Sequence, residues 1–231
     1  MKIDAIQLNT FLSKATLNGV IPMCVMNVAD KKISISVKSV DNVGVVISEL
    51  KITSNDKMEL CIKDTSRLLQ ALKLFDKEIE LIKESNVLSI LNADRQVDLT
   101  LSSVEFIDNH LTKELKLEYD DGINIKNTLF KNIVKDSSII GSDKITIEFT
   151  ETELKMFTGE KGFDTISETQ KLDKPYVICK TKFGKMLTEV IEVIDEQINI
   201  KMKSDFPVLL TEKTEVMTIK YLVAPIVDKG E

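Results

Sequence analysis

The feature that most constrains the fold of this chain is one order of elements, a strand, a helix and three more strands, which occurs four times. Strands are recognised by apolar residues that alternate with polar ones, as in residues 33–37 (ISISV). Helices are recognised by apolar residues three and four positions apart, as in Leu8, Phe11 and Leu12. Four copies of one module indicate a repeated architecture with several antiparallel sheets.

The four repeats are placed as follows. The first has a strand at residues 1–5, a helix at 7–17 and strands at 23–28, 32–38 and 43–50. The second has a strand at 58–62, a helix at 66–75 and strands at 79–83, 87–91 and 96–101. The third has a strand at 114–119, a turn at 120–122, a helix at 126–135 and strands at 144–149, 153–157 and 163–169. The fourth has a strand at 176–180, a helix at 181–194 and strands at 197–203, 206–210 and 216–222.

A non-periodic stretch divides the four repeats into two pairs. We expect an N-terminal domain at 1–102, a linker at 103–113 and a C-terminal domain at 114–231. Similar residues, such as Phe11 and Phe130, indicate that the second half duplicates the first. The predicted fold class is therefore α+β, with two similar domains of two β-α-β-β-β units each and the helices on one face of antiparallel sheets.

The solvent-facing sides of the four helices are predicted to be basic, although the whole chain has a formal charge of -6. These sides carry two acids, Glu189 and Glu192, and seven cations. The cations are Lys14, Arg67, Lys73, Lys131, Lys135, Lys182 and Lys185. A local basic surface on an acidic protein indicates a polyanionic partner. Aromatic residues make up 5% of the chain and tryptophan is absent, so contacts to phosphates are favoured over stacking on exposed bases.

Several classes of function are disfavoured by what the sequence lacks. The three cysteines, Cys24, Cys61 and Cys179, lie far apart and there is one histidine, His110, so we expect no disulfide framework and no metal site. No phosphate-binding glycine motif occurs, and we expect no cofactor and no enzyme activity. No apolar run reaches the roughly 20 residues of a membrane span, and no secretory signal begins the sequence, so an intracellular protein is expected.

Two stretches carry a resemblance to a known family. Residues 204–208 (SDFPV) and 218–225 (TIKYLVAP) are similar to the S-A-D-x-P and closing K-Y-x-L-A-P motifs of DNA sliding clamps of the proliferating cell nuclear antigen type. Residues 39–45 (SVDNVGV) resemble the S-M-D-x-x-H-V loop of that family, with Val40 and Gly44 in place of its Met and His. The pattern is similar to archaeal or viral clamps.

The resemblance implies a ring of three subunits, homomeric or mixed, whose helices surround double-stranded DNA without reading its sequence. It implies that a clamp loader places the ring on DNA and that polymerases and other replication and repair proteins with a clamp-binding motif dock in an apolar groove. By position, that groove comprises Val40, Gly44, Val45, Val104, Phe106, Ile107, Leu111, Pro207, Leu222, Ala224 and Pro225. The resemblance also implies that subunits join through edge strands that include Gln96, Asp98 and Thr100 on one chain and Asp164, Ile166 and Glu168 on the next.

Two other functions stay open at this point. A protein of the same fold could act as a monomeric processivity subunit that holds DNA by charge alone. A carboxylate-dependent hydrolase is the alternative from another class, with Asp120 and Asp121 as its acid pair, although a turn before Gly122 explains these residues more simply.

Overall fold

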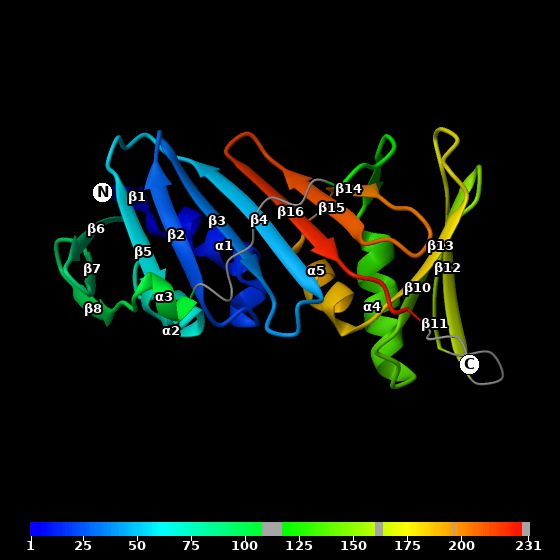
Figure 1. Cartoon of the computed structure of the whole chain (residues 1–231), viewed down its shortest axis with the longest axis horizontal. Helices are drawn as coiled ribbons and strands as arrows, with labels where there is room; N and C mark the ends of the chain where they lie inside the picture. The colour runs from blue at the N-terminus through cyan, green and yellow to red at the C-terminus, as the bar shows by residue number, and fades with distance from the viewer. Residues whose placement is uncertain (108–116, 160–163, 196, 228–231) are drawn as a thin grey trace. The chain divides into compact units, whose positions relative to one another are not determined.

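The computed structural model describes residues 1–107, 117–159, 164–195 and 197–227. Within them, strands pair antiparallel and a few short helices pack against the sheets (Figure 1), which confirms the expected α+β class. The chain divides into two compact units, one formed by Met1–Leu115 with Lys213–Lys220 and the other by Lys116–Glu212 with Tyr221–Glu231. They are called unit 1 and unit 2 below.

Unit 1 contains the first two repeats. Its elements are β1 (Lys2–Asp4), α1 (Ala5–Ala15), the 3-10 turn η1 (Leu17–Gly19), β2 (Cys24–Ala29), β3 (Lys32–Lys38), β4 (Gly44–Lys51), β5 (Met58–Ile62), α2 (Thr65–Leu72), β6 (Glu78–Glu84), β7 (Val87–Leu91), β8 (Gln96–Thr100) and α3 (Val104–Ile107). The two repeats exchange their first strands. One sheet has the order β1-β6-β7-β8, and the other strands are ordered β5-β2-β3-β4. Each repeat therefore completes the sheet of the other.

The helices of unit 1 begin in the same way in both repeats. The Asp4 carboxylate accepts a hydrogen bond of 2.7 Å from the backbone N–H of Gln7, and the Asp64 carboxylate accepts one of 2.8 Å from that of Arg67. Such caps satisfy N–H groups that have no partner within the helix. The buried sides of the helices, which include Phe11 and Leu68, contribute to a core between the sheets.

Unit 2 contains the last two repeats. Its elements are β9 (Ile123–Lys126), α4 (Thr128–Ile139), β10 (Ile145–Phe149), β11 (Glu153–Gly159), β12 (Thr165–Lys171), β13 (Cys179–Phe183), α5 (Lys185–Val193), β14 (Gln197–Lys201) and β15 (Val208–Lys213). The division between the units runs through the last strand, β16 (Met217–Val223). First strands are exchanged here as well, because β13 pairs with β10 beside β11 and β12, and β9 pairs with β14. Asn127 donates hydrogen bonds of 2.8–3.2 Å to the carbonyls of Ile191, Ile194 and Asp195, which ties the start of α4 to the end of α5.

Several predicted element boundaries are shifted, and the main corrections are in the third and fourth repeats. The first strand of the third repeat lies at Ile123–Lys126, after the predicted turn, because Ile123 and Ile125 are the residues that alternate into the core. Residues 117–119, where the strand was expected, are not in a strand, and residues 114–116 lie outside the described part. In the fourth repeat the helix begins at Lys185, because Gly184 has extended backbone angles and ends β13. Residues 181–183, predicted as helix, are therefore strand.

The predicted linker is described only at its start. Residues Val104–Ile107 form the short helix α3, while residues 108–116 lie outside the described part of the chain. The domain boundaries at residues 102 and 113 thus stay a prediction.

Candidate nucleic-acid and partner interfaces

In unit 1, two of the three predicted DNA-binding cations are exposed. The two helices α1 and α2 pack against each other. Arg67 lies in the first turn of α2 and Lys73 directly follows its last residue, and both side chains are exposed. Both cations are thus available to an anionic partner.

Lys14 is buried, and the expectation that it lies on the outer side of its helix is wrong. Only 4% of its surface is exposed. It follows the fully buried Phe11 by three positions, and residues three apart share one side of a helix. Its aliphatic stem can pack there like an apolar side chain. Lys14 therefore cannot present its charge on the surface as predicted.

In unit 2, Lys182 is also misplaced by the prediction. It lies on β13, opposite Thr146 of β10, and is half-buried. Cys179, Thr181 and Phe183 alternate into the core, so the intervening lysine points to the other face of the sheet. It does not belong to the helical surface of α5.

The other cations of unit 2 lie on its two helices, which pack against each other. Lys131 and Lys135 are exposed on α4, and Lys185 is exposed at the start of α5. The ammonium group of Lys185 lies 3.3 Å from the Glu189 carboxylate. That ion pair reduces the charge that Lys185 offers. Across the two units, five of the seven predicted cations are exposed on or directly beside a helix.

The loop between β3 and β4 holds an apolar side chain out toward solvent. The Ser39 hydroxyl donates to the Asp41 carboxylate and accepts from the backbone N–H of Gly44 at 2.8 Å. The Asp41 carboxylate also accepts from the N–H of Val43 at 3.1 Å. These bonds fix the loop, and Val40 at its tip is 64% exposed. Val45, at the start of β4, is half-buried and Gly44 is buried.

The start of the linker is anchored to unit 1 by Ile107. Its side chain is fully buried against Val25 and Cys61, with Met23 packed beside them. Val104 and Phe106 are 38% and 63% exposed. Ile107 was expected to line the partner groove, but its side chain has no exposed surface to offer. Of the predicted linker residues, Val104 and Phe106 remain accessible, and Leu111 lies outside the described residues.

The predicted groove residues of unit 2 are partly accessible. Pro207, Ala224 and Pro225 are half-buried, whereas Leu222 is only 7% exposed. The chain beyond β16 runs beside β13, since the N–H of Ile226 donates to the carbonyl of Lys182 at 2.8 Å. Leu222 as a direct contact for a partner is therefore disfavoured.

Sequence reasoning missed two aromatic residues beside Pro207. The Tyr119 hydroxyl donates a hydrogen bond of 2.9 Å to the Pro207 carbonyl. The rings of Tyr119 and Phe206 meet edge to face, with centroids 5.5 Å apart. Burial raises the pKa of Tyr119 to about 12. Phe206 follows the quoted S-D dipeptide directly, so the signal for it was present, but Tyr119 was assigned to a strand.

The predicted subunit-contact residues lie on two outer strands. Among the described residues, β8 forms one edge of the sheet β1-β6-β7-β8, and β12 forms one edge of β12-β11-β10-β13. Gln96, Asp98 and Thr100 are exposed on β8. On β12, Ile166 and Glu168 are half-buried, and Asp164 lies one residue before the strand. Gln96 donates to the Asp98 carboxylate at 3.0 Å, and this bond is the largest of the causes that lower the Asp98 pKa.

Asp120 and Asp121 lie beside an open pocket of unit 2. Lys174, Pro175, Tyr176 and Val177 line the same pocket. Within the described ranges, no group of three or more histidine, cysteine or acidic residues is arranged to hold a metal ion. The described helices also include none long and apolar enough to cross a membrane.

The comparisons with known proteins show the fold. No protein-family model matches the sequence, and no curated protein matches it. Solved structures match over nearly the whole chain. The structure of the C-terminal region of FEN-1 bound to A. fulgidus PCNA matches with a TM-score of 0.84 at 16% identity, covering 99% of this chain and 98% of that one.

Two further clamps match at similar levels. Proliferating cellular nuclear antigen from Entamoeba histolytica matches with a TM-score of 0.79 at 18% identity, over 98% of each chain. PCNA from Thermococcus kodakaraensis matches with a TM-score of 0.78 at 18% identity, over 97% of this chain and 99% of that one. The chain therefore has the sliding-clamp fold, as the sequence resemblance predicted.

Proposed function

We propose that this chain is a DNA polymerase processivity factor, a sliding clamp in which three copies close into a ring around duplex DNA. The observation that carries the proposal is the pair of outer strands β8 and β12 in a chain with the clamp fold. A sheet edge exposes backbone N–H and C=O groups that can pair with another chain. A contact between two different edges is heterologous, and it closes into a ring when the rotation between subunits permits.

The charge of the helices suits a clamp better than a tight DNA-binding protein. The exposed cations Arg67, Lys73, Lys131, Lys135 and Lys185 are few for each chain and lie on or next to helices. Phosphate contacts carry no sequence information, and each one adds a salt-dependent contribution to affinity. Weak contacts of this kind let a ring slide. A monomeric subunit that holds DNA by charge alone would need more of them, so it is the less favoured candidate.

The proposed partner groove would receive a peptide with apolar and aromatic anchors. Val40, Val45, Val104 and Phe106 supply apolar surface in unit 1, and Pro207, Ala224 and Pro225 supply it in unit 2. Polymerases and other replication and repair proteins with a clamp-binding motif are the proposed occupants, and a clamp loader the proposed means of opening the ring. We propose no catalytic role for Asp120 and Asp121.

Retention on DNA is the decisive test. Native mass measurement of the full chain should give three copies per particle. The protein loaded by a clamp loader should stay on closed circular DNA and leave the same DNA after linearisation. Equal retention on both DNA forms, with steep salt dependence, would indicate the monomeric subunit instead. Turnover of a phosphate or acyl substrate that is lost in Asp120→Asn would indicate the hydrolase.

A further inference from the structure

An open pocket of about 500 Å³ lies in unit 2 between the turn at residues 120–121 and the segment that precedes β13. It is called the unit 2 pocket below, and its lining residues are Asp120, Asp121, Lys174, Pro175, Tyr176 and Val177. The described residues of the proposed partner groove do not line it. The pocket is therefore a surface to which the proposed function assigns no partner.

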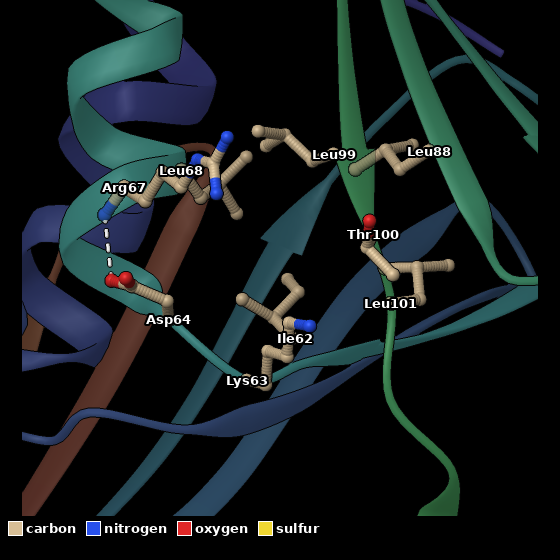
Figure 2. Close-up of a pocket in the computed structure, with 9 residues that line it drawn as sticks. All are labelled: Ile62, Lys63, Asp64, Arg67, Leu68, Leu88, Leu99, Thr100 and Leu101. Atoms are coloured by element: carbon tan, nitrogen blue, oxygen red, sulfur yellow. Dashed lines mark hydrogen bonds between the residues drawn. The ribbon is translucent and has the colours of Figure 1, made fainter.

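A pocket in unit 1 differs in what can reach it. Figure 2 shows Arg67 and Leu68 of α2 facing Leu88 and Leu99 across this pocket. Thr100 of the edge strand β8 also lines it, and the proposed function assigns that edge to contact with another copy of the chain. The unit 1 pocket thus adjoins the proposed subunit contact, whereas the unit 2 pocket is open to a different partner.

Two neighbouring aliphatic side chains are held out toward solvent at the unit 2 pocket. Val177 and Ile178 are 50% and 67% exposed, although Tyr176 before them and Cys179 after them are buried. Single exposed apolar side chains are common on protein surfaces, whereas contiguous apolar surface beside a pocket is typical of interaction sites. A partner that covers this pair would remove apolar surface from water.

Tyr176 fixes this segment in place. Its ring packs against Phe149, with centroids 4.5 Å apart, and its hydroxyl accepts a hydrogen bond of 3.0 Å from the backbone N–H of Met202. The backbone N–H of Tyr176 donates to the Glu151 carbonyl at 3.2 Å. The exposed pair that follows is therefore preorganised, and a partner would bind it without first ordering the segment.

The exposed charge around the unit 2 pocket is mostly negative. In residues 118–121 and 173–177, together with residue 151, the exposed charged side chains are five carboxylates and one ammonium group, namely Glu118, Asp120, Asp121, Glu151 and Asp173 against Lys174. Such a surface attracts a cationic partner and repels DNA. A second copy of this chain is disfavoured as the occupant, because its own formal charge is -6.

We propose that the unit 2 pocket is a docking site for a basic segment of another protein that places an aliphatic side chain in the pocket. The aliphatic side chain would pack against Pro175, Val177 and Ile178. Lysine or arginine residues on either side of it would face Asp120 and Asp121. The pocket belongs to one unit of one chain, so the site needs neither the ring nor the partner groove. It would recruit proteins that lack a clamp-binding motif.

The first test measures binding of a fluorescent synthetic peptide, Lys-Lys-Leu-Leu-Lys-Lys, to the full chain. Val177→Ser with Ile178→Ser should weaken binding about tenfold or more, because apolar contact with the leucines is lost. The matched double variant Ile6→Ser with Val216→Ser removes aliphatic side chains of 59% and 43% exposure from unit 1 and should bind like the wild type. All four side chains are on the surface, so unchanged thermal unfolding verifies that the variants fold.

The second test addresses the charge of the occupant. Asp120→Asn with Asp121→Asn should weaken binding of the same peptide about fivefold at low salt, and the difference should shrink as salt screens the charges. Asp76→Asn with Asp94→Asn removes two exposed carboxylates from unit 1 and should leave the affinity unchanged. Peptides with serine in place of leucine, or with glutamate in place of lysine, should bind more weakly to the wild type.

Disulfide trapping gives the position of the bound peptide. Cys24, Cys61 and Cys179 are buried, so Val177→Cys adds an accessible thiol. A peptide with cysteine in place of one leucine should form a disulfide with this variant under mild oxidation, because a disulfide needs Cα atoms within about 7 Å. Val216→Cys, in unit 1, should trap much less of the peptide.

Several results would overturn the site. Absence of binding, or equal affinity of the wild type and the double variant at Val177 and Ile178, would show that the apolar pair receives no basic segment. Tighter binding of the glutamate peptide would exclude a basic occupant. Displacement by a clamp-binding peptide would show that the pocket is part of the partner groove. A lower native mass of the double variant would assign the surface to a second copy. The proposed ring is tested separately, by the native mass of the wild type and its retention on circular DNA.

Discussion

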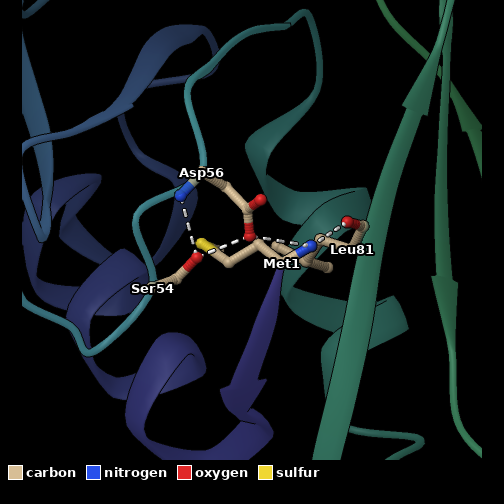
Figure 3. A network of polar contacts seen from close by, with 4 residues as sticks. All are labelled: Met1, Ser54, Asp56 and Leu81. Carbon is tan, nitrogen blue, oxygen red and sulfur yellow. Dashed lines mark hydrogen bonds and ion pairs between the residues drawn. The ribbon is translucent and has the colours of Figure 1, made fainter.

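The amino group of Met1 lies 3.5 Å from the carboxylate of Asp56 and donates a hydrogen bond of 2.8 Å to the carbonyl of Leu81 (Figure 3). The Ser54 hydroxyl donates to the same carboxylate and accepts from the N–H of Asp56. The network joins the loop before β5 to strand β6 at the point where the chain begins β1. It lowers the pKa of Asp56, first through the hydroxyl of Ser54 and then through the charge of the Met1 ammonium.

The sign of this shift predicts an acid-dependent loss of stability. A carboxyl whose pKa is lowered by folding stabilises the protein above its unfolded pKa of about 3.9, and the contribution is lost as the pH falls through the folded value. Asp56→Asn should therefore lower the melting temperature at neutral pH. The difference from the wild type should shrink as the pH falls below about 4. Asp173→Asn, which removes an exposed carboxylate of unit 2, serves as the control. A deficit that stays constant down to low pH would contradict the prediction.

The raised pKa values of the tyrosines predict that the folded protein loses stability at alkaline pH. Burial is the largest cause that raises the pKa values of Tyr119, Tyr176 and Tyr221, the first to about 12. A tyrosine whose pKa is raised by folding makes its full contribution to stability below its unfolded pKa of about 10. That contribution is lost as the pH rises through the pKa of the folded state. The ultraviolet absorbance of phenolate should thus stay low in the folded protein at pH 10.5. Tyr119→Phe should remove the part of the phenolate titration that lies near pH 12. It should also lower the free energy of unfolding by about 1 kcal/mol, because the hydrogen bond to the Pro207 carbonyl is lost. Half-ionisation of any tyrosine near pH 10 without unfolding would contradict it.

The helical cations predict a change in salt dependence. Lys131→Ala with Lys135→Ala removes two exposed charges from α4. If both contact phosphates, the slope of log affinity against log salt should fall by about 1.8 for each chain, from roughly 0.9 per contact. Binding to short duplexes of different sequence measures it. The double variant Lys31→Ala with Lys57→Ala removes two exposed lysines away from the helices and should keep the wild-type slope. Equal salt slopes for both double variants would show that α4 does not contact the DNA.

The buried position of Lys14 predicts a change in stability without a change in the salt dependence of DNA binding. Because its side chain is buried, Lys14→Ala removes packing rather than a surface charge. We expect a loss of about 1–3 kcal/mol in the free energy of unfolding, measured in urea, and an unchanged salt slope for DNA binding. A reduced salt slope for DNA binding together with wild-type stability would show that Lys14 contacts DNA, as the sequence predicts.

The sequence predicted the order of elements because alternation and helical spacing are local signals, and Ile33, Phe11 and Leu68 lie in the core as those signals require. It failed where two signals competed. Phe183 has a helical spacing to Leu187 and Val190, yet Gly184 ends a strand there, so Lys182 and Phe183 lie on β13. Likewise, Ile107 and Phe106 are both apolar linker residues, and only the contact with Val25 and Cys61 determines which of them is buried. Contacts between segments far apart in the chain are not encoded in local periodicity.

Ile107 is buried and its neighbour Phe106 is exposed, so substitutions at the two positions should affect stability and peptide binding differently. Ile107→Ala removes a fully buried side chain from its cluster and should lower the free energy of unfolding by about 2 kcal/mol or more. It should also weaken binding of a clamp-binding peptide, because the start of the linker loses its anchor. Phe106→Ala removes a side chain that is 63% exposed, so it should leave stability unchanged and weaken peptide binding by itself. Urea unfolding and calorimetric titration with one peptide measure both. Val227→Ala, at an apolar position with 69% exposure, is the control. Unchanged peptide affinity in Phe106→Ala would show that the groove does not extend to the linker.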